Sequence, residues 1–134
     1  QLAREVVASG ADVVVGHGPH TAQPAELCHV NQPDIVPGIG TCSLRTDDET
    51  PRDAAVLYSL GNFGTDMNTL PLEVGLVATV SLDASGVTGL AWEAVASVDD
   101  GDPSVVPLQT LVSDPAYAEE DARLRAHLGG GWER

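Results

Sequence analysis

The segment VVVGHGPHTAQP, Val13 to Pro24, holds the residues of this sequence that are best suited to do chemistry. His17 and His20 are two of its 4 histidines, and they lie close together in a loop rich in glycine and proline. Neutral imidazole is a good ligand for Zn, Mn, Fe or Ni. A stiff loop loses less entropy when its side chains are ordered around a cation. The spacing therefore makes His17 and His20 candidate metal ligands.

The residues before this loop predict the elements that position it. Leu2–Ser9 fits the end of an amphipathic helix, and Gly10 is suited to end that helix in a left-handed conformation. The apolar face of the helix is predicted to comprise Leu2, Ala3, Val6 and Val7. Val13–Val15 then predicts an interior strand, buried on both faces as in a parallel sheet. Ligands of open α/β sheets bind beyond the carboxyl ends of such strands, which is where the histidines lie.

A second loop is predicted to face the same cleft. Ala54–Leu60, AAVLYSL, is typical of another short apolar strand, and the loop GNFGTD that follows it contains Asn62. Asn62 is therefore a candidate for contact with a ligand near the histidines. The alternative is a turn asparagine whose side chain caps its own backbone. Between the two loops, Ala22–Glu26 is predicted to form a short strand or a turn.

The segment Cys28–Asp53 is predicted to be a long excursion with little regular structure, because it is rich in proline and glycine and contains the charged run TDDET. We interpret it as a lid or as a surface insertion, with His29 on its surface. Cys28 and Cys42 are too few to define a disulfide scaffold, and their spacing does not fit a zinc knuckle. A bridge between them and two free thiols are both open alternatives.

The remaining sequence predicts a hairpin and a helix. Glu73–Asp83 and Val87–Val98 favour two antiparallel strands joined by a tight turn. Val105–Leu111 favours a short edge strand, since it contains a proline. Asp114 as N-cap and Pro115 at the first helical position predict a C-terminal helix. The residues of this helix that we expect on its buried face are Leu124 and Leu128.

The composition narrows the class of protein. A chain of 134 residues fits one domain with a real core, and the formal net charge of −14 should repel nucleic acid. No apolar run approaches the roughly 20 residues needed to span a bilayer, so we expect no transmembrane segment. The chain opens with Gln1 inside a helical pattern, and no targeting segment is visible. We interpret it as a fragment or a processed product.

Two motifs together carry a resemblance to a known family. The segment AREVVASGADVVVGHGPHTAQPAE, followed by VLYSLGNF, resembles the C-terminal half of the CapA family of poly-γ-glutamate capsule biosynthesis proteins. The resemblance covers residues 1 to about 81 and continues more loosely to Leu111. It implies an α/β (α+β) fold class, as the C-terminal part of a calcineurin-like metallophosphoesterase β-sandwich flanked by helices. Residues 1–111 would belong to that domain, with 28–53 as a loop insertion, and 112–134 would form a C-terminal helix and tail.

The resemblance also implies roles for the candidate residues. His17 and His20 match the family's last metal-binding motif, and they would ligate one or both of two divalent metal ions, expected to be Mn, Fe or Zn. Gly18 stands where many members have a second histidine. The other ligands would come from earlier strands, so the N-terminal half of the same domain is the expected partner. Alone, this chain is expected to bind metal poorly and to turn over no substrate.

The function implied by the resemblance is that of a metal-dependent phosphoesterase in capsule metabolism. Two cations would polarise a phosphoryl oxygen and activate water, and His17 or His20 could protonate the leaving oxygen. Asn62 would contact the substrate, which is a phosphate ester or an anionic polymer. The alternative is a non-catalytic envelope scaffold or polymer-anchoring module with a degenerate metal site. Either function suggests the cell envelope or the extracellular side.

Overall fold

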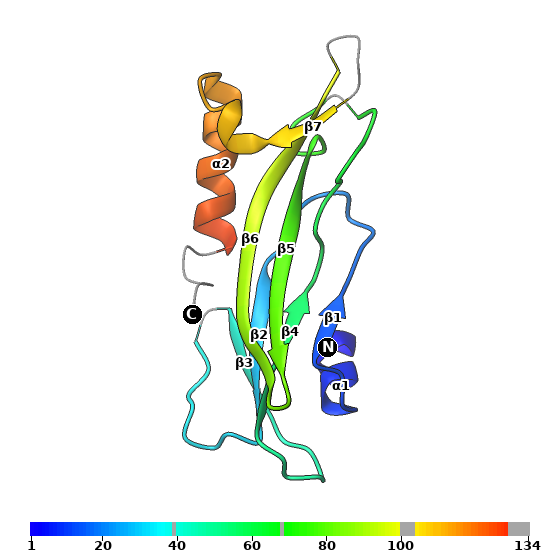
Figure 1. Cartoon of the computed structure of the whole chain (residues 1–134), viewed down its shortest axis with the longest axis vertical. Coiled ribbons are helices and arrows are strands. Elements are labelled where there is room, and N and C mark those ends of the chain that lie inside the picture. The colour runs from blue at the N-terminus through cyan, green and yellow to red at the C-terminus, as the bar shows by residue number, and fades with distance from the viewer. Residues whose placement is uncertain (39, 68, 100–103, 129–134) are drawn as a thin grey trace.

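The structure is a computed structural model that describes residues 1–38, 40–67, 69–99 and 104–128. Within these residues it is a mixed α/β arrangement with a seven-stranded sheet and two α-helices (Figure 1). The elements in chain order are α1 (Leu2–Ala8), β1 (Val13–Val15), β2 (Ala25–Val30), β3 (Thr41–Leu44), β4 (Arg52–Leu57), β5 (Val74–Asp83), β6 (Gly86–Val98), β7 (Ser104–Pro107), the 3₁₀ turn η1 (Leu108–Thr110) and α2 (Pro115–Leu128). The predicted α/β class is confirmed.

The sheet has the strand order β3-β2-β4-β6-β5, with β1 paired to β4 and β7 paired to β6. The β1–β4 and β2–β3 pairs are parallel, while β2–β4 and β6–β7 are antiparallel. The predicted hairpin is confirmed as β5–β6, which forms the long curved ribbon of Figure 1. β4 meets this hairpin at the pair Asp53 and Gly86. Figure 1 also shows α1 beside β1 and α2 beside β6.

The prediction that residues 28–53 have little regular structure is wrong where this segment joins the sheet: it contains the end of β2, the whole of β3 and the start of β4. β2 lies between β3 and β4, so its backbone groups are hydrogen bonded on both sides. The interpretation of residues 28–53 as an insertion or a lid stays a prediction. The prolines that suggested a loop fall in the two connections, outside β2 and β3. Because the partners of β2 are distant in sequence, the local pattern of turn residues did not reveal it.

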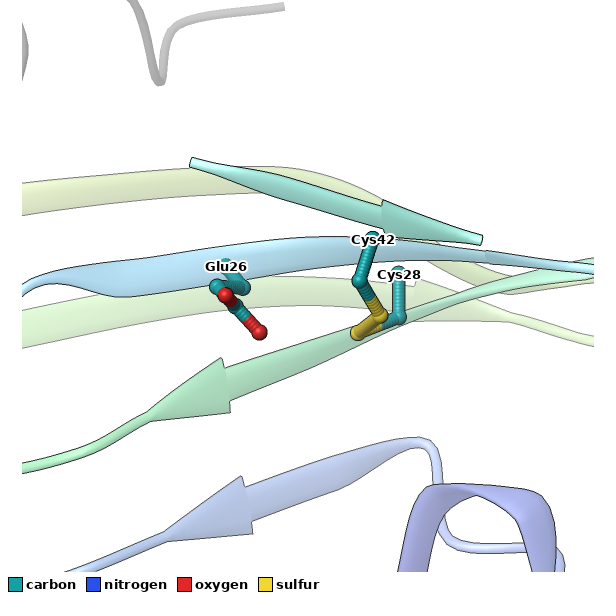
Figure 2. Close-up of side chains that lie close together, drawn as sticks. All are labelled: Glu26, Cys28 and Cys42. Carbon is teal, nitrogen blue, oxygen red and sulfur yellow. A yellow bond between two sulfur atoms is a disulfide. The ribbon is translucent and has the colours of Figure 1, made fainter. Parts of the chain in front are cut away.

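The open question about the cysteines is decided in favour of a bridge. Cys28 on β2 and Cys42 on β3 are directly opposite in the parallel register, with Cα atoms 4.3 Å apart, and their sulfur atoms are bonded (Figure 2). The bridge is buried in an apolar cluster with Val7, Val30 and Val56. It therefore ties the edge strand β3 to the core under α1.

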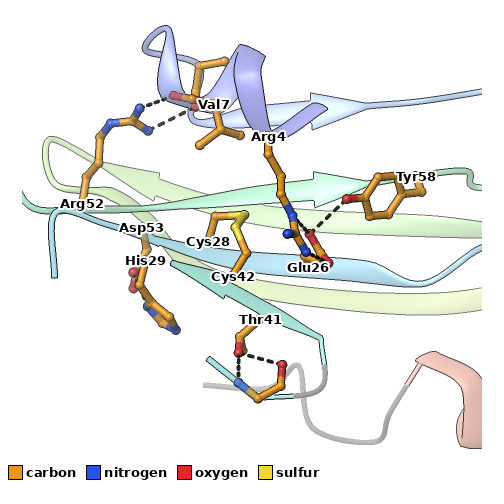
Figure 3. Close-up of a disulfide and its surroundings, with 12 residues drawn as sticks. Arg4, Val7, Glu26, Cys28, His29, Thr41, Cys42, Arg52, Asp53 and Tyr58 are labelled. Atoms are coloured by element: carbon orange, nitrogen blue, oxygen red, sulfur yellow. Dashed lines mark hydrogen bonds and ion pairs between the residues drawn. A yellow bond between two sulfur atoms is a disulfide. The ribbon is translucent and has the colours of Figure 1, made fainter. Parts of the chain in front are cut away.

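His29 was expected on the surface, and that prediction is wrong. Its side chain is buried, and its Nδ1 lies 2.7 Å from Oδ1 of Asp53 on the neighbouring strand β4 (Figure 3). Gln32 donates a second hydrogen bond to the same carboxylate oxygen. Because β2 is an interior strand, a polar side chain on its covered face needs such a partner.

The first helix is confirmed, but its predicted apolar face is only partly correct. Val7 is fully buried, whereas Leu2 is 74% exposed and Val6 is 41% exposed. Val7 packs in the apolar cluster around the disulfide. Val6 and Leu2 lie on other sides of the helix, because they are one and five positions before Val7 and the helix has 3.6 residues per turn. Arg52 donates a hydrogen bond of 2.6 Å to the carbonyl of Val7 and so satisfies the end of α1 (Figure 3).

The strand β1 also differs from its prediction. It pairs with β4 alone among the described residues, and Val15 is 47% exposed. The expectation of an interior strand buried on both faces is therefore wrong for this chain. Its parallel direction is confirmed by the register of Val13 with Ala55 and of Val15 with Leu57.

The C-terminal helix follows its prediction, whereas the edge strand predicted over Val105–Leu111 is only partly correct, because β7 ends at Pro107 and Leu108–Thr110 form the 3₁₀ turn η1. Asp114 accepts a hydrogen bond from the backbone N–H of Ala116, as an N-cap does, and α2 begins at Pro115. Leu124 and Leu128 are buried with the apolar face of the β5–β6 hairpin. The tail expected after this helix, residues 129–134, lies outside the described residues. In the part of the chain that the structure describes, no helix is long and apolar enough to cross a membrane.

Candidate functional site

Parallel pairing of β1 and β4 places the two candidate loops at one edge of the sheet. Val15 is in register with Leu57, so the chain leaves both strands at the same level. The histidine loop follows β1, and the loop with Asn62 follows β4. The two segments then continue side by side, because Ala22 forms a bridge with Leu60. Two loops that are distant in sequence thus meet beyond the carboxyl ends of parallel strands.

Glycines allow the close packing of this edge. The N–H of Gly16 donates a hydrogen bond of 2.7 Å to the carbonyl of Leu57, and a Cβ atom on Gly16 would collide with the carbonyl oxygen of Tyr58. Gly61 has a φ angle of 70°, which a glycine adopts without strain. On the hairpin side, a Cβ atom on Gly75 would collide with the carbonyl oxygen of Asn62. The backbone of both loops is therefore held in close contact with its neighbours.

The side chains of His20 and Asn62 are in direct contact. Nδ1 of His20 lies 2.9 Å from Oδ1 of Asn62, and His20 itself has a φ angle of 59°. The amide nitrogen of Asn62 donates a hydrogen bond of 2.8 Å to the carbonyl of Leu72. This second bond fixes the amide, so its NH₂ group faces Leu72 and its oxygen faces His20. The Asn62 side chain thus reaches beyond its own turn, unlike the backbone cap considered from the sequence.

The hydrogen-bond chain determines the proton position on His20. Oδ1 of Asn62 can only accept a hydrogen bond, so Nδ1 of His20 must donate it. In the neutral imidazole, Nε2 then carries no proton and has a free lone pair, which is the form that ligates a metal. A hydrogen bond from the other ring nitrogen is the usual way in which proteins orient a ligating histidine. The side chain of His20 is exposed, so solutes can reach it.

His17 is the other candidate ligand. It lies two residues after the end of β1, and its side chain is exposed. Both histidines of the motif are therefore accessible on the loop that the sequence predicted. Their sharing of a cation stays a prediction, as do the catalytic role of either residue and the substrate contact of Asn62.

A known protein family matches the part of the chain that contains His17, His20 and Asn62. The family model of the bacterial capsule synthesis protein PGA_cap matches residues 1–67. The chain belongs to the PGA_cap family. No curated protein and no solved structure matches the chain. The resemblance to capsule biosynthesis proteins is therefore confirmed, and family membership associates the chain with capsule synthesis and so with the cell envelope.

The PGA_cap region includes α1, β1 to β4 and both candidate loops. It therefore contains the His20–Asn62 contact, whereas Leu72, which orients the amide of Asn62, lies beyond its end. The hairpin β5–β6 and the helix α2 also lie beyond it. Their contribution to the site is structural, because β5 follows the connection that holds Asn62 and supplies Gly75 beside its backbone.

A second polar cluster of the PGA_cap region was missed from the sequence. Arg4 donates two hydrogen bonds, of 2.9 and 2.6 Å, to the carboxylate of Glu26, and Tyr58 donates a third of 3.0 Å (Figure 3). The hydrogen bonds from Arg4 hold the pKa of Glu26 below its usual range, although partial burial opposes this. Burial and the bond to Glu26 raise the pKa of Tyr58. No local signal in the sequence marks this cluster, because Glu26 is 22 positions from Arg4 and 32 positions from Tyr58, and only the fold brings the three side chains together.

Proposed function

We propose that this chain contributes the histidine loop of a metal-dependent phosphoesterase with a calcineurin-like fold, acting in poly-γ-glutamate capsule biosynthesis. The observation that carries this proposal is the hydrogen-bond chain from His20 through Asn62 to Leu72. It holds an exposed imidazole with its Nε2 lone pair available, beyond the end of a parallel strand.

The donor set fits divalent cations of the Zn, Mn or Fe type. Such ions bind neutral imidazole, and the tautomer of His20 supplies it. His17 would be the second ligand from the same loop. Bound cations would supply Lewis acidity toward a phosphoryl oxygen and would activate water. A binuclear site needs more ligands than these two residues, so further donors would come from the N-terminal half of the domain.

The chain's own residues have separate roles in this proposal. The amide oxygen of Asn62 accepts a hydrogen bond from His20, and its amide nitrogen donates one to the carbonyl of Leu72. This favours a role in positioning His20 over the substrate contact expected from the sequence. The stiff loop keeps His17 and His20 at the sheet edge, which lowers the entropy lost on binding.

The exposed side of α1 and β1 is the proposed place of the N-terminal half. Leu2, Val6 and Val15 are large apolar side chains with substantial exposure there. The edge of β1 that faces away from β4 pairs with no strand of the described residues. A further parallel strand would cover this edge and make β1 interior, which is the environment that its Val13–Val15 sequence favours.

The test uses the protein with both halves of this domain. We expect the double variant His17→Ala, His20→Ala to lose most of its bound metal, measured by elemental analysis, and its hydrolysis of bis-p-nitrophenyl phosphate. The matched control is His127→Ala, which removes an exposed histidine of α2 outside the PGA_cap region. Unchanged metal content in the double variant would contradict the proposal. Metal loss without any hydrolysis by the parent protein would favour the envelope scaffold instead.

A further inference from the structure

A second group of potential metal ligands lies under α1, on strands β2 and β3. One ligand atom each of Glu26, Cys28 and Cys42 lies within 4.8 Å of the other two (Figure 2). Glu26 and Cys28 are two positions apart on β2 and share one face, and Cys42 is opposite Cys28 on β3. The sheet therefore brings two sulfur atoms and a carboxylate together on adjoining strands.

We propose that the reduced form of this chain binds one Zn²⁺ through the thiolates of Cys28 and Cys42 and the carboxylate of Glu26. The disulfide and the zinc site would then exclude each other, because zinc binds the thiolate form of cysteine and a disulfide contains no thiolate. Zn²⁺ would be bound by Cys28 and Cys42 before the disulfide forms, and oxidation of the two thiolates to the disulfide would release the ion. This inference is independent of the proposed phosphoesterase function.

The chemistry of the change balances with an external dithiol or phosphine as the reductant. Two electrons and two protons convert the disulfide into two thiols, while the dithiol becomes a disulfide or the phosphine becomes its oxide with oxygen from water. Zn²⁺ then displaces the two thiol protons and forms two Zn–S bonds. Thiolate and carboxylate are both established zinc ligands, and a water molecule can complete a tetrahedral site.

The surroundings of Glu26 support this role. A ligating carboxylate is usually oriented by further hydrogen bonds, and Arg4 and Tyr58 provide three of them here. The charges also balance, since two thiolates and one carboxylate would be neutralised by Zn²⁺ and the guanidinium of Arg4. Such compensation matters because Cys28 is fully buried.

The carboxylate side of the cluster is the route by which an ion could enter. The side chain of Glu26 is 17% exposed, and that of Arg4 is 45% exposed. Arg4 projects from the short helix α1, and its two hydrogen bonds to Glu26 would have to open while an ion enters and re-form afterwards. Rotation about the Cα–Cβ bonds of Cys28 and Cys42 would separate the two sulfur atoms once the bond between them is broken.

The test uses Co²⁺ as a spectroscopic probe of the purified protein, reduced with a phosphine under anaerobic conditions. We expect one equivalent of Co²⁺ to produce thiolate-to-cobalt charge-transfer bands, and Zn²⁺ to abolish them. The oxidised protein should give no such bands. The His17→Ala, His20→Ala variant should give the same bands as the parent, which separates this site from the histidine loop. Absence of the bands in the reduced parent would overturn the inference.

Two further measurements distinguish a folded site from thiols of an unfolded chain. Glu26→Gln should weaken Co²⁺ binding at least about tenfold, the scale of losing a group that supports a metal site, and Cys42→Ser should abolish the charge-transfer bands. Zn²⁺ should raise the Tm of the reduced protein, or restore its far-UV circular dichroism if reduction unfolds it. Equal binding by Glu26→Gln, or a lower Tm with Zn²⁺, would overturn the proposed site.

Discussion

Nδ1 of His20 lies 2.9 Å from Oδ1 of Asn62, a residue 42 positions later in the chain. Parallel pairing of β1 with β4 makes this contact possible, because it places the ends of both strands at one level. The contact also selects one tautomer of His20.

Removing the amide of Asn62 should release His20. In Asn62→Ala, the imidazole loses its acceptor, so we expect a mixture of the two neutral tautomers where the parent has the Nδ1–H form. Nitrogen chemical shifts of the His20 ring, measured by NMR without metal, report this directly. In the protein with both halves of the domain, metal affinity should also fall by about 10- to 100-fold. Thr69→Ala, in an exposed position of the following connection, is the control. An unchanged tautomer in Asn62→Ala would contradict the assigned role.

The close approach of the two loops should make Gly16 intolerant of a side chain. A Cβ atom there collides with the carbonyl oxygen of Tyr58, so Gly16→Ala should lower the free energy of unfolding by about 1–3 kcal/mol. Gly64→Ala is a matched control, since the nearest atom to its new Cβ would be Val105 Cγ2 at 3.9 Å. Chemical denaturation of both variants checks this. Equal free energies of unfolding for Gly16→Ala and Gly64→Ala would contradict close packing between the histidine loop and the backbone of Tyr58.

The bridge between Cys28 and Cys42 should stabilise the fold. It closes a loop with a sequence separation of 14, and a loop of this size corresponds to about 3 kcal/mol of unfolding free energy. We therefore expect the denaturation midpoint to fall on reduction, with two thiols appearing in a thiol assay. A midpoint that does not move while both thiols appear would rule out this contribution. Disulfides persist in oxidising compartments, which agrees with the association of the family with the cell envelope.

The Arg4–Glu26 pair should make stability depend on pH in a defined direction. Hydrogen bonds from Arg4 lower the pKa of Glu26 in the folded state. The contribution is therefore present above the unfolded pKa, about 4.3, and is lost as the pH falls through the lower folded value. Arg4→Gln should cost about 0.5–1 kcal/mol at neutral pH, because the pair is partly exposed.

The control for this pH effect is Arg45→Gln, which removes the same charge from another exposed position. The difference in unfolding free energy between the parent and Arg4→Gln should shrink in acid, whereas that for Arg45→Gln should stay small throughout. Denaturation curves at neutral and acidic pH measure both differences. A constant difference for Arg4→Gln across this range would contradict the linkage.

Local signals in the sequence determined the elements whose residues are close neighbours in the chain. Gly10 ends α1 with a φ angle of 112°, as its permissive backbone predicts. Asp114 caps α2, and the turn between β5 and β6 joins adjacent strands. These features depend on backbone preferences and short-range hydrogen bonds, so residue type and spacing suffice to predict them. The candidate histidine loop was found from its residue types and their spacing, which are also local features of the chain.

Tertiary structure alone decided the rest. β2 and β3 form because distant strands satisfy their backbone groups, and the same pairing joins Cys28 to Cys42 and buries His29 against Asp53. The contact of His20 with Asn62 likewise depends on the register of β1 with β4. Strand pairing, burial and side-chain partners are properties of the folded sheet, whose long-range contacts leave no local pattern in the chain.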